Sequence, residues 1–311
     1  MIATPPFLVH ASQVHVSFAA LGDQILTPSE LAAFIRTNVP QWRYSPDPAS
    51  TDLPSLVDSG KVWALRSDSI QAVIHSVLQH KAAKKITLPF PYRTEHRYMV
   101  GQVSDLELVQ SLDKTGYFSH FTAIHMNQLT DQIPKTIYFN VEQYTSGGGG
   151  KLTQESLHRA FKAKPRISSN VIEYNQVRIH RLNGGNTHQL GVTEIAVGHS
   201  ATPVRVTDIE RTLIDATVRP VYSGGIAVVA KAFEMAIDRV SVKRIVEYLK
   251  GIDYTYPYHQ AIGFYLDRAG YKNPDSDLLR DFPMQFDFYL AHDIKSAEYN
   301  AKWKLFVPKG F

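Results

Sequence analysis

Two histidines lie in the segment GYFSHFTAIHMNQLTDQIPKTIYFN, residues 116–140, which is rich in groups that could do chemistry. His120 and His125 are five residues apart, and in a helix that spacing turns their side chains onto different faces. A zinc-binding helix instead places two histidines four residues apart with a glutamate between them. We therefore expect structural or interface histidines here and no metal site.

A glycine-rich segment, TSGGGGKLT at residues 145–153, follows a predicted strand and precedes a predicted helix. A phosphate-binding P-loop has this context, but it needs glycine at its first position and Ser or Thr directly after its lysine. Thr145 and Leu152 occupy those two positions. The pattern predicts a flexible connector, and no cofactor is expected.

Acidic residues near the end of the chain raise the alternative of an enzyme. The segment at residues 286–304 contains Asp287, Asp293 and Glu298 among lysines. A metal-dependent nuclease of the PD-(D/E)xK type would need a Glu-x-Lys spacing, which this segment lacks. The Gly-x-Ser-x-Gly elbow of serine hydrolases is also absent. A nuclease or nucleotide-modifying enzyme in the C-terminal half is the alternative to a non-enzymatic protein.

A second polar segment, RVTDIERTLIDA at residues 205–216, reads as the start of a helix. Thr207 and Glu210 have the spacing of a capping box. Arg211 and Asp215 are four residues apart, so they should pair on the helix surface. These structural roles account for the polar residues without catalysis.

Basic residues gather in two parts of the chain. Residues 61–97 contain seven Lys or Arg against two acids, and residues 151–181 repeat this balance. Such clusters form solvated faces by default, and next to a DNA-binding fold they can contact phosphates.

Composition narrows the class of protein. The chain has 311 residues, 44% of them hydrophobic, and a net charge of +4. It contains no cysteine, which excludes disulfides, thiol catalysis and cysteine-ligated metals. The N-terminal residues lack the basic region of a signal peptide, and no apolar run is long enough to span a membrane. A cytoplasmic protein without a membrane partner is expected.

The elements that position these groups divide into two predicted domains of an α+β protein. Residues 1–90 have the order of a winged helix-turn-helix: helices at 12–21, 27–35 and 50–60, then a strand at 61–67. A further helix is expected at 69–85. The Pro-rich segment at 88–93 marks the predicted boundary.

Residues 91–311 are predicted to form a larger α/β domain. Ser104 and Glu107 form a capping box at its first helix. The remaining strands are expected at 135–141, 170–182, 192–198 and 203–207, with helices at 119–129, 153–164, 207–218, 224–237, 241–250 and 258–270.

Two segments together resemble the AbiEi-type antitoxins of type IV toxin–antitoxin, or abortive infection, systems. The resemblance covers residues 98–270. It rests on Tyr117, Ser119, His120, Thr130 and Pro134 in the first segment and Thr207, Glu210, Arg211 and Asp215 in the second.

The resemblance implies a non-enzymatic phage-defence protein with two activities. Its winged helix would bind double-stranded promoter DNA and repress its own operon. Its C-terminal domain would neutralise a nucleotidyltransferase-like toxin, without the need for a stable complex. A transcriptional regulator that has no toxin is the second alternative.

For the DNA-binding domain, the helix at residues 50–60 is predicted to enter the major groove. The predicted DNA-contacting residues are Arg36, Arg43, Ser50, Thr51, Lys61, Arg66, Lys84 and Lys85.

Overall fold

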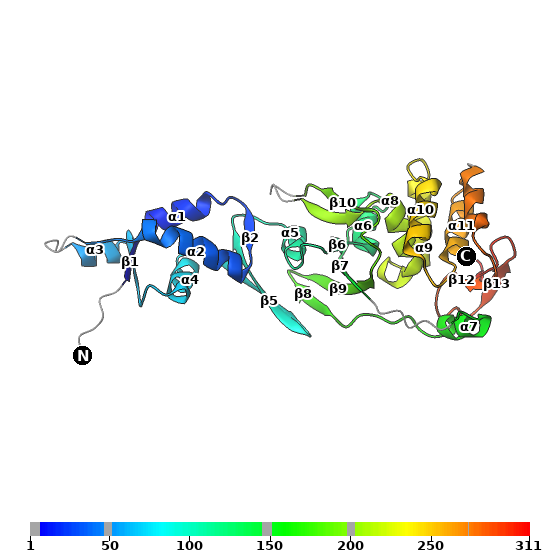
Figure 1. Ribbon diagram of the computed structural model, residues 1–311, viewed down its shortest axis with the longest axis horizontal. Coiled ribbons are helices and arrows are strands. Elements are labelled where there is room, and N and C mark those ends of the chain that lie inside the picture. The colour runs from blue at the N-terminus through cyan, green and yellow to red at the C-terminus, as the bar shows by residue number, and fades with distance from the viewer. Residues whose placement is uncertain (1–6, 47–51, 145–150, 198–202, 273) are drawn as a thin grey trace. The chain divides into compact units, whose positions relative to one another are not determined.

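The computed structural model describes residues 7–46, 52–144, 151–197, 203–272 and 274–311. It has the predicted mixed α+β fold and divides into two compact units (Figure 1). The N-terminal unit comprises Met1–Leu112 with Ala196–Pro203, and the C-terminal unit comprises Asp113–Ile195 with Val204–Phe311. Ser50, Thr51 and the four consecutive glycines of the predicted connector lie outside the described residues.

The N-terminal unit alternates short strands with helices. In chain order its elements are β1 (Phe7–His10), α1 (Ala11–Ala19), β2 (Gln24–Leu26), α2 (Pro28–Trp42), α3 (Leu53–Asp58), β3 (Val62–Leu65), α4 (Ile70–Gln79), β4 (Lys84–Phe90), β5 (Arg93–Val100) and α5 (Asp105–Gln110).

A winged helix is present in this unit, as predicted, but a different helix precedes its wing. The three-stranded sheet has the order β2-β5-β4, and β4 and β5 form the wing hairpin. The three helices of the motif are therefore α1, α2 and α4. The predicted third helix, α3, belongs to an insertion with β3, which pairs with β1 rather than with the wing.

Local sequence signals fix where the helices of this unit begin. The hydroxyl of Thr27 accepts a hydrogen bond from Glu30 N, and the Glu30 carboxylate accepts one from Thr27 N, as a capping box requires. The helix continues to Trp42, beyond the predicted end at residue 35, because Trp42 is fully buried against Phe18 and Phe34.

The helix predicted at residues 69–85 ends earlier, at Gln79. Lys81 has a φ of 58°, a left-handed conformation that ends the helical path, and β4 begins three residues later. Lys84 and Lys85 therefore lie on a strand.

The Pro-rich segment at residues 88–93 lies inside a hairpin instead of between domains. β4 and β5 pair in antiparallel register from Lys84–Met99 to Phe90–Arg93. Pro89 is tolerated in β4 because this strand is at the edge of the sheet, where a missing N–H costs little. The compact unit consequently extends to Leu112 and does not end at residue 90.

The C-terminal unit contains a mixed six-stranded sheet, a smaller sheet and a group of helices. Its elements are β6 (Tyr117–Phe118), α6 (His120–Met126), β7 (Thr136–Gln143), α7 (Gln154–Lys162), β8 (Val171–Tyr174), β9 (Val177–Gly185), β10 (Val192–Ile195), β11 (Val204–Thr207), α8 (Ile209–Val218), η1 (Pro220–Tyr222), α9 (Ile226–Ala236), α10 (Val242–Ile252), α11 (Tyr258–Arg268), η2 (Pro274–Asp281), β12 (Phe288–Tyr289), β13 (Ala297–Asn300) and β14 (Leu305–Pro308).

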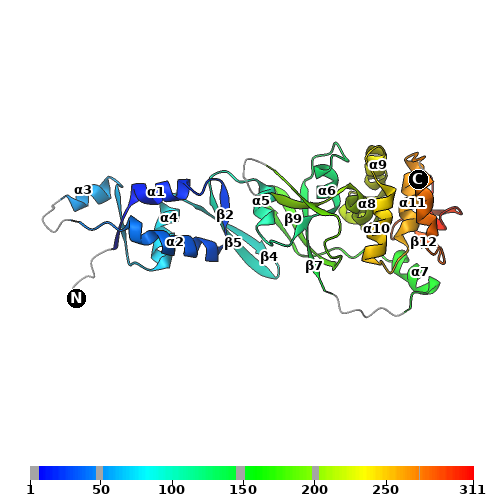
Figure 2. The ribbon, with the colours of Figure 1, turned by 45° about the horizontal axis from the view of Figure 1, so that its top comes forward.

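The strand order in the larger sheet is β10-β11-β6-β7-β9-β8, and in the smaller sheet it is β12-β14-β13. Helices α8, α9 and α10 lie between the larger sheet and α11 (Figure 2). One hydrophobic core joins these helices to the smaller sheet. Trp303, in the turn between β13 and β14, packs directly on Gly263 of α11. No helix in the described part of the chain is long and apolar enough to cross a membrane.

Candidate functional site

A buried polar network connects the two family-motif segments in the C-terminal unit. Tyr117 on β6 donates a hydrogen bond to Glu142 Oε1 at 2.9 Å and accepts one from Asn140 Nδ2 at 2.8 Å. Thr187 donates to the same Glu142 carboxylate through both its hydroxyl and its backbone N–H. Burial favours a raised pKa at Glu142, but the hydrogen bonds from Thr187 and Tyr117 outweigh it and lower the pKa. Glu142 is therefore held as a carboxylate.

Arg211 is the centre of this network. Its Nε donates to Asp215 Oδ1 at 2.8 Å, which confirms the predicted pair, but both side chains are buried instead of lying on the helix surface. Nη1 donates to Thr187 Oγ1 and to the Leu190 carbonyl, and Nη2 donates to the Tyr117 hydroxyl. Burial works to lower the pKa of Arg211, yet the adjacent Asp215 carboxylate outweighs this and raises it. The guanidinium therefore stays charged and joins both motif segments.

The predicted capping box at Thr207 is wrong by one residue. Asp208 caps α8, because its carboxylate accepts a hydrogen bond from Arg211 N at 2.8 Å. Thr207 instead shares a hydrogen bond with the Thr212 hydroxyl at 2.7 Å. Glu210 turns away from the cap and accepts hydrogen bonds from Ser241 N and Arg244 Nη1. It therefore fixes the start of α10 against α8.

His120 combines a strained backbone with a buried ring. Its φ of 53° is left-handed, a conformation that non-glycine residues rarely adopt and that is concentrated at functional sites. The ring Nδ1 lies 2.8 Å from Ser119 Oγ. Burial lowers the pKa of His120 to about 4. The imidazole is therefore neutral at physiological pH.

Acidification should destabilise the protein through two buried histidines, His120 and His259. Burial also lowers the pKa of His259 to about 4, so both histidines bind protons more weakly in the folded than in the unfolded chain. Stability should fall as the pH drops from about 6.5 to about 4, by roughly 1.4 kcal/mol per pH unit for each histidine. His120→Gln should remove part of this slope in urea unfolding at several pH values. His125→Gln, an exposed position on the same helix, should keep the full slope; equal slopes in the two variants would contradict the prediction.

A cavity of about 610 Å³ opens beside the polar network, entirely within the C-terminal unit. His120, Asn140, Thr187, Arg211 and Asp215 form part of its wall. Its other lining residues are Arg166, Ser168, Leu182, Asn183, Gly184, Gly185, Asn186, Val218, Arg219, Tyr222, Ile252, Asp253, Tyr254, Thr255, Tyr256 and Tyr258. The structure thus brings His120, Arg211 and Asp215 to one concave surface.

Other motif residues do not reach this cavity. Thr130 Oγ1 accepts a hydrogen bond from Gln132 N, and Pro134 is half-buried before β7. Sequence reasoning missed Asn140, Glu142 and Thr187. A signal was available in the paired glycines at the end of β9, because a Cβ at Gly184 would lie 2.7 Å from Asn140 Oδ1. Glycine in a strand often marks such a close approach.

In the N-terminal unit, α4 exposes a polar stripe. Gln71, His75 and Gln79 are exposed at four-residue spacing, whereas Val73, Ile74 and Val77 face the core. The predicted DNA-reading helix α3 has only six residues and no buried side chain. Side-chain amides and imidazoles can donate to and accept from base edges, so α4 replaces α3 as the candidate reading helix.

The predicted basic residues are distributed over several elements of this unit. Lys84 and Lys85 are exposed on β4 and, with Lys81, surround a hollow of about 460 Å³. Lys61 and Arg66 are exposed at the two ends of β3, in the insertion and away from the wing strands.

Two further arginines and the turn between β4 and β5 are also exposed in the N-terminal unit. Arg36 is exposed on α2, and Arg43 lies over the Phe7 ring. The turn of the wing exposes Tyr92 and Arg93. Arg93 belongs to the basic cluster counted at residues 61–97, whereas Tyr92 was not predicted to be part of a site.

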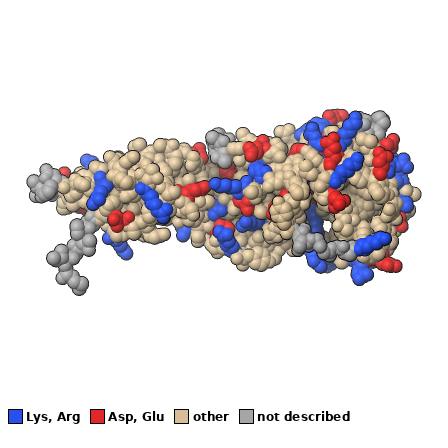
Figure 3. Space-filling view, in the orientation of Figure 1, with Lys and Arg blue, Asp and Glu red and all other residues tan. Residues whose placement is uncertain are grey.

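Charge on the C-terminal unit is mixed on the face shown in Figure 3. Lys and Arg alternate there with Asp and Glu and form no single basic patch.

The comparisons with known proteins identify a structural relative only. A scan against protein-family models gives no match, and a search of curated proteins gives none either. A solved structure, the crystal structure of the Rv2827c protein from Mycobacterium tuberculosis, is similar over nearly the whole chain. It is 13% identical with a TM-score of 0.56, and the similarity covers 98% of this chain and 93% of that one.

At this identity the similarity shows the fold alone. Because it covers both units, the same succession of a winged helix and a larger α+β unit occurs in a second protein of very different sequence.

Proposed function

We propose that the protein is a cytoplasmic antitoxin that represses its own operon by binding promoter DNA and neutralises a nucleotidyltransferase-like toxin. The DNA-binding half of this proposal is carried by one observation, the polar stripe on α4 next to exposed lysines of β4. Helices that precede a wing read the major groove, and basic groups beside them neutralise phosphates.

The antitoxin half rests on the resemblance of the two motif segments. Their residues are joined by the Arg211 network, so both segments contribute to one folded unit. The hydrogen bonds of Arg211 to Asp215, Thr187 and Tyr117 give these motif residues a role in folding, which supports a binding protein as the first proposal and an enzyme as the alternative.

Two assays on the full chain test the proposal. The chain should shift a fragment of its own promoter at concentrations that leave scrambled DNA free. Co-expression should also restore growth to cells that produce the neighbouring toxin. Promoter binding without growth rescue would indicate a regulator without a toxin, and loss of both activities would leave the proposal without support.

The lysines of β4 should provide phosphate contacts. Lys84→Ala/Lys85→Ala should weaken promoter binding and reduce the slope of log affinity against log salt by about 2, because two phosphate contacts are lost. The matched control Lys162→Ala/Lys164→Ala removes two exposed lysines of the C-terminal unit and should leave the slope unchanged. If only the control lowers the salt slope, the phosphate contacts lie in the C-terminal unit and not on β4.

A further inference from the structure

The cavity beside the Arg211 network has groups that its own fold does not use. Arg211 and Asp215 neutralise each other in its wall. Arg166 and Arg219 line the same cavity, are exposed, and have no side-chain hydrogen bond or ion pair among the described residues. Against these two free cations stands one exposed carboxylate, Asp253. The cavity therefore favours an anion.

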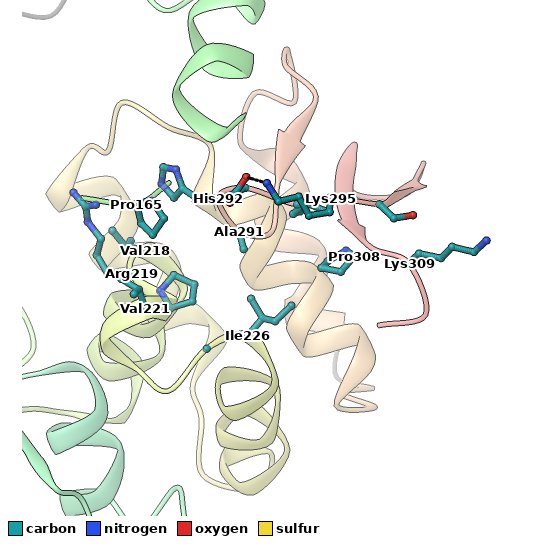
Figure 4. A pocket seen from close by; sticks show the side chains of 15 residues that line it. Pro165, Val218, Arg219, Val221, Ile226, Ala291, His292, Lys295, Pro308 and Lys309 are labelled. Atoms are coloured by element: carbon teal, nitrogen blue, oxygen red, sulfur yellow. Dashed lines mark hydrogen bonds and ion pairs between the residues drawn. The ribbon is translucent and has the colours of Figure 1, made fainter. Parts of the chain in front are cut away.

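The backbone of Arg219 is fixed by a hydrogen bond, whereas its guanidinium has no hydrogen bond or ion pair in the part of the chain that the structure describes. It follows the last turn of α8, and its N–H donates to the Asp215 carbonyl at 3.0 Å. An apolar cavity of about 460 Å³ also borders Arg219, but the Arg219 side chain extends away from Ile226 and Pro308 of that cavity (Figure 4). Its charge lowers the pKa of His120, which lies in the wall of the cavity beside the Arg211 network, and burial lowers this pKa further and by more.

Aromatic rings form another part of the polar cavity's lining. Tyr222, Tyr254, Tyr256 and Tyr258 all border it. Tyr222 is fixed, because its hydroxyl accepts a hydrogen bond from Ser168 N at 2.7 Å, and Tyr254 packs edge-on against Tyr258 at 5.3 Å. Tyrosines at a binding site supply flat surfaces for a planar ring.

Uncharged hydrogen-bonding groups also line the cavity. Asn183 and Asn186 line the cavity, and the neutral imidazole of His120 can donate or accept at its second nitrogen. Gly185 leaves space, since a Cβ there would meet no atom within 4 Å. Such groups suit the hydroxyls of a sugar or the edge of a base.

We propose that this cavity binds a nucleotide, with the phosphate on Arg166 and Arg219 and the base against the tyrosines. Arginine binds phosphate oxygens in a bidentate manner, and the volume lies in the usual range for small-molecule sites, about 300–1,000 Å³. A bare phosphate would leave the aromatic wall unused, and a nucleoside would leave the arginines unused. The nucleotide can be free or can be the terminal residue of a nucleic acid.

Isothermal titration calorimetry on the full chain tests this site. The probes are AMP, GMP, CMP, UMP and ATP, their nucleosides, and inorganic phosphate. At least one nucleotide should bind more tightly than its own nucleoside and more tightly than phosphate. Absence of binding by all five nucleotides at millimolar concentration would overturn the proposal, and so would phosphate or a nucleoside binding equally well.

Point variants separate this site from DNA binding by the N-terminal unit. Arg219→Ala and Arg166→Ala should each weaken the best nucleotide by about tenfold or more, because each removes a charged hydrogen-bond donor. Arg159→Ala, an exposed arginine on α7 outside the cavity, should bind as the unaltered chain does. Equal binding by all three variants would show that the nucleotide lies elsewhere and would overturn the proposal.

A steric variant and a short RNA complete the design. Gly185→Phe should fill the cavity and abolish binding while circular dichroism shows an intact fold; undiminished binding would contradict the assigned site.

A six-nucleotide RNA that ends in the best nucleotide tests whether the ligand is a free nucleotide or the end of a nucleic acid. Tighter binding of the RNA, lost in Arg219→Ala, would support a chain end as the ligand, and tighter binding of the free nucleotide would support the cellular pool.

Discussion

Arg211→Ala is expected to lower the free energy of unfolding by about 3–5 kcal/mol, the cost of removing one partner from a buried ion pair. The variant leaves the Asp215 carboxylate buried without its cation. It also removes donors to the Leu190 carbonyl, Thr187 and Tyr117, so both motif segments lose their connection. Urea unfolding followed by circular dichroism measures the change.

Two controls show whether the effect belongs to the buried pair. Glu234→Ala breaks the exposed ion pair of Lys231 and Glu234 and should change stability by less than about 1 kcal/mol. The double variant Arg211→Met/Asp215→Leu replaces both charges by apolar groups and should be more stable than Arg211→Ala. If Arg211→Ala unfolds like the unaltered chain but nucleotide binding is lost, Arg211 is a ligand-binding residue and not a structural one.

Local signals in the sequence predicted helix starts well. The capping boxes at Thr27 and Ser104 are both present, because each depends on atoms three residues apart in the chain. At Thr207 the same spacing gave a wrong prediction, because Asp208 caps α8 and Glu210 accepts hydrogen bonds from Ser241 and Arg244 at the start of α10. Those partners lie more than 30 residues away, so the local pattern could not reveal them.

The identity of the helix that precedes the wing depended on contacts between residues that are distant in the chain. From order alone, the helix at residues 50–60 followed by a strand looked like the end of a winged helix. Pairing decides otherwise, because β3 joins β1 at the start of the chain whereas β4 and β5 join β2. Strand alternation predicts that a strand exists but does not predict its partner.

The cavity also could not be predicted from local sequence patterns. Its residues come from many elements, among them α6, β7, β9, α8, η1 and the segment between α10 and α11. From the sequence, only His120, Arg211 and Asp215 were singled out as motif residues, and Arg166 was counted in the basic cluster at residues 151–181. Arg219 and the tyrosines carried no spacing signal, because topology and not chain proximity brings them together. The glycines of β9 were the one local sign of a crowded strand end.

Gln71→Ala/His75→Ala is expected to weaken binding to the promoter fragment by about 30-fold or more, because two contacts are lost. Each side chain is exposed on the core-opposite face of α4, and a good contact with a base edge contributes about 1–3 kcal/mol of discrimination. Counterion release comes from lysines and arginines that neutralise phosphates, and this variant removes neither, so the salt slope and the affinity for scrambled DNA should stay nearly constant. Fluorescence anisotropy with both DNA fragments at several salt concentrations measures all three quantities.

The matched control, Lys61→Ala/Arg66→Ala, distinguishes the two possible reading surfaces. Both of its residues flank β3, which pairs with β1 outside the wing sheet. If α4 reads the promoter, this control should keep its preference for the promoter over scrambled DNA. If the control loses that preference while Gln71→Ala/His75→Ala binds fully, the α3–β3 insertion and not α4 contacts the bases of the promoter. Unchanged toxin rescue by both variants would then show that DNA reading and antitoxin activity reside in different parts of the chain.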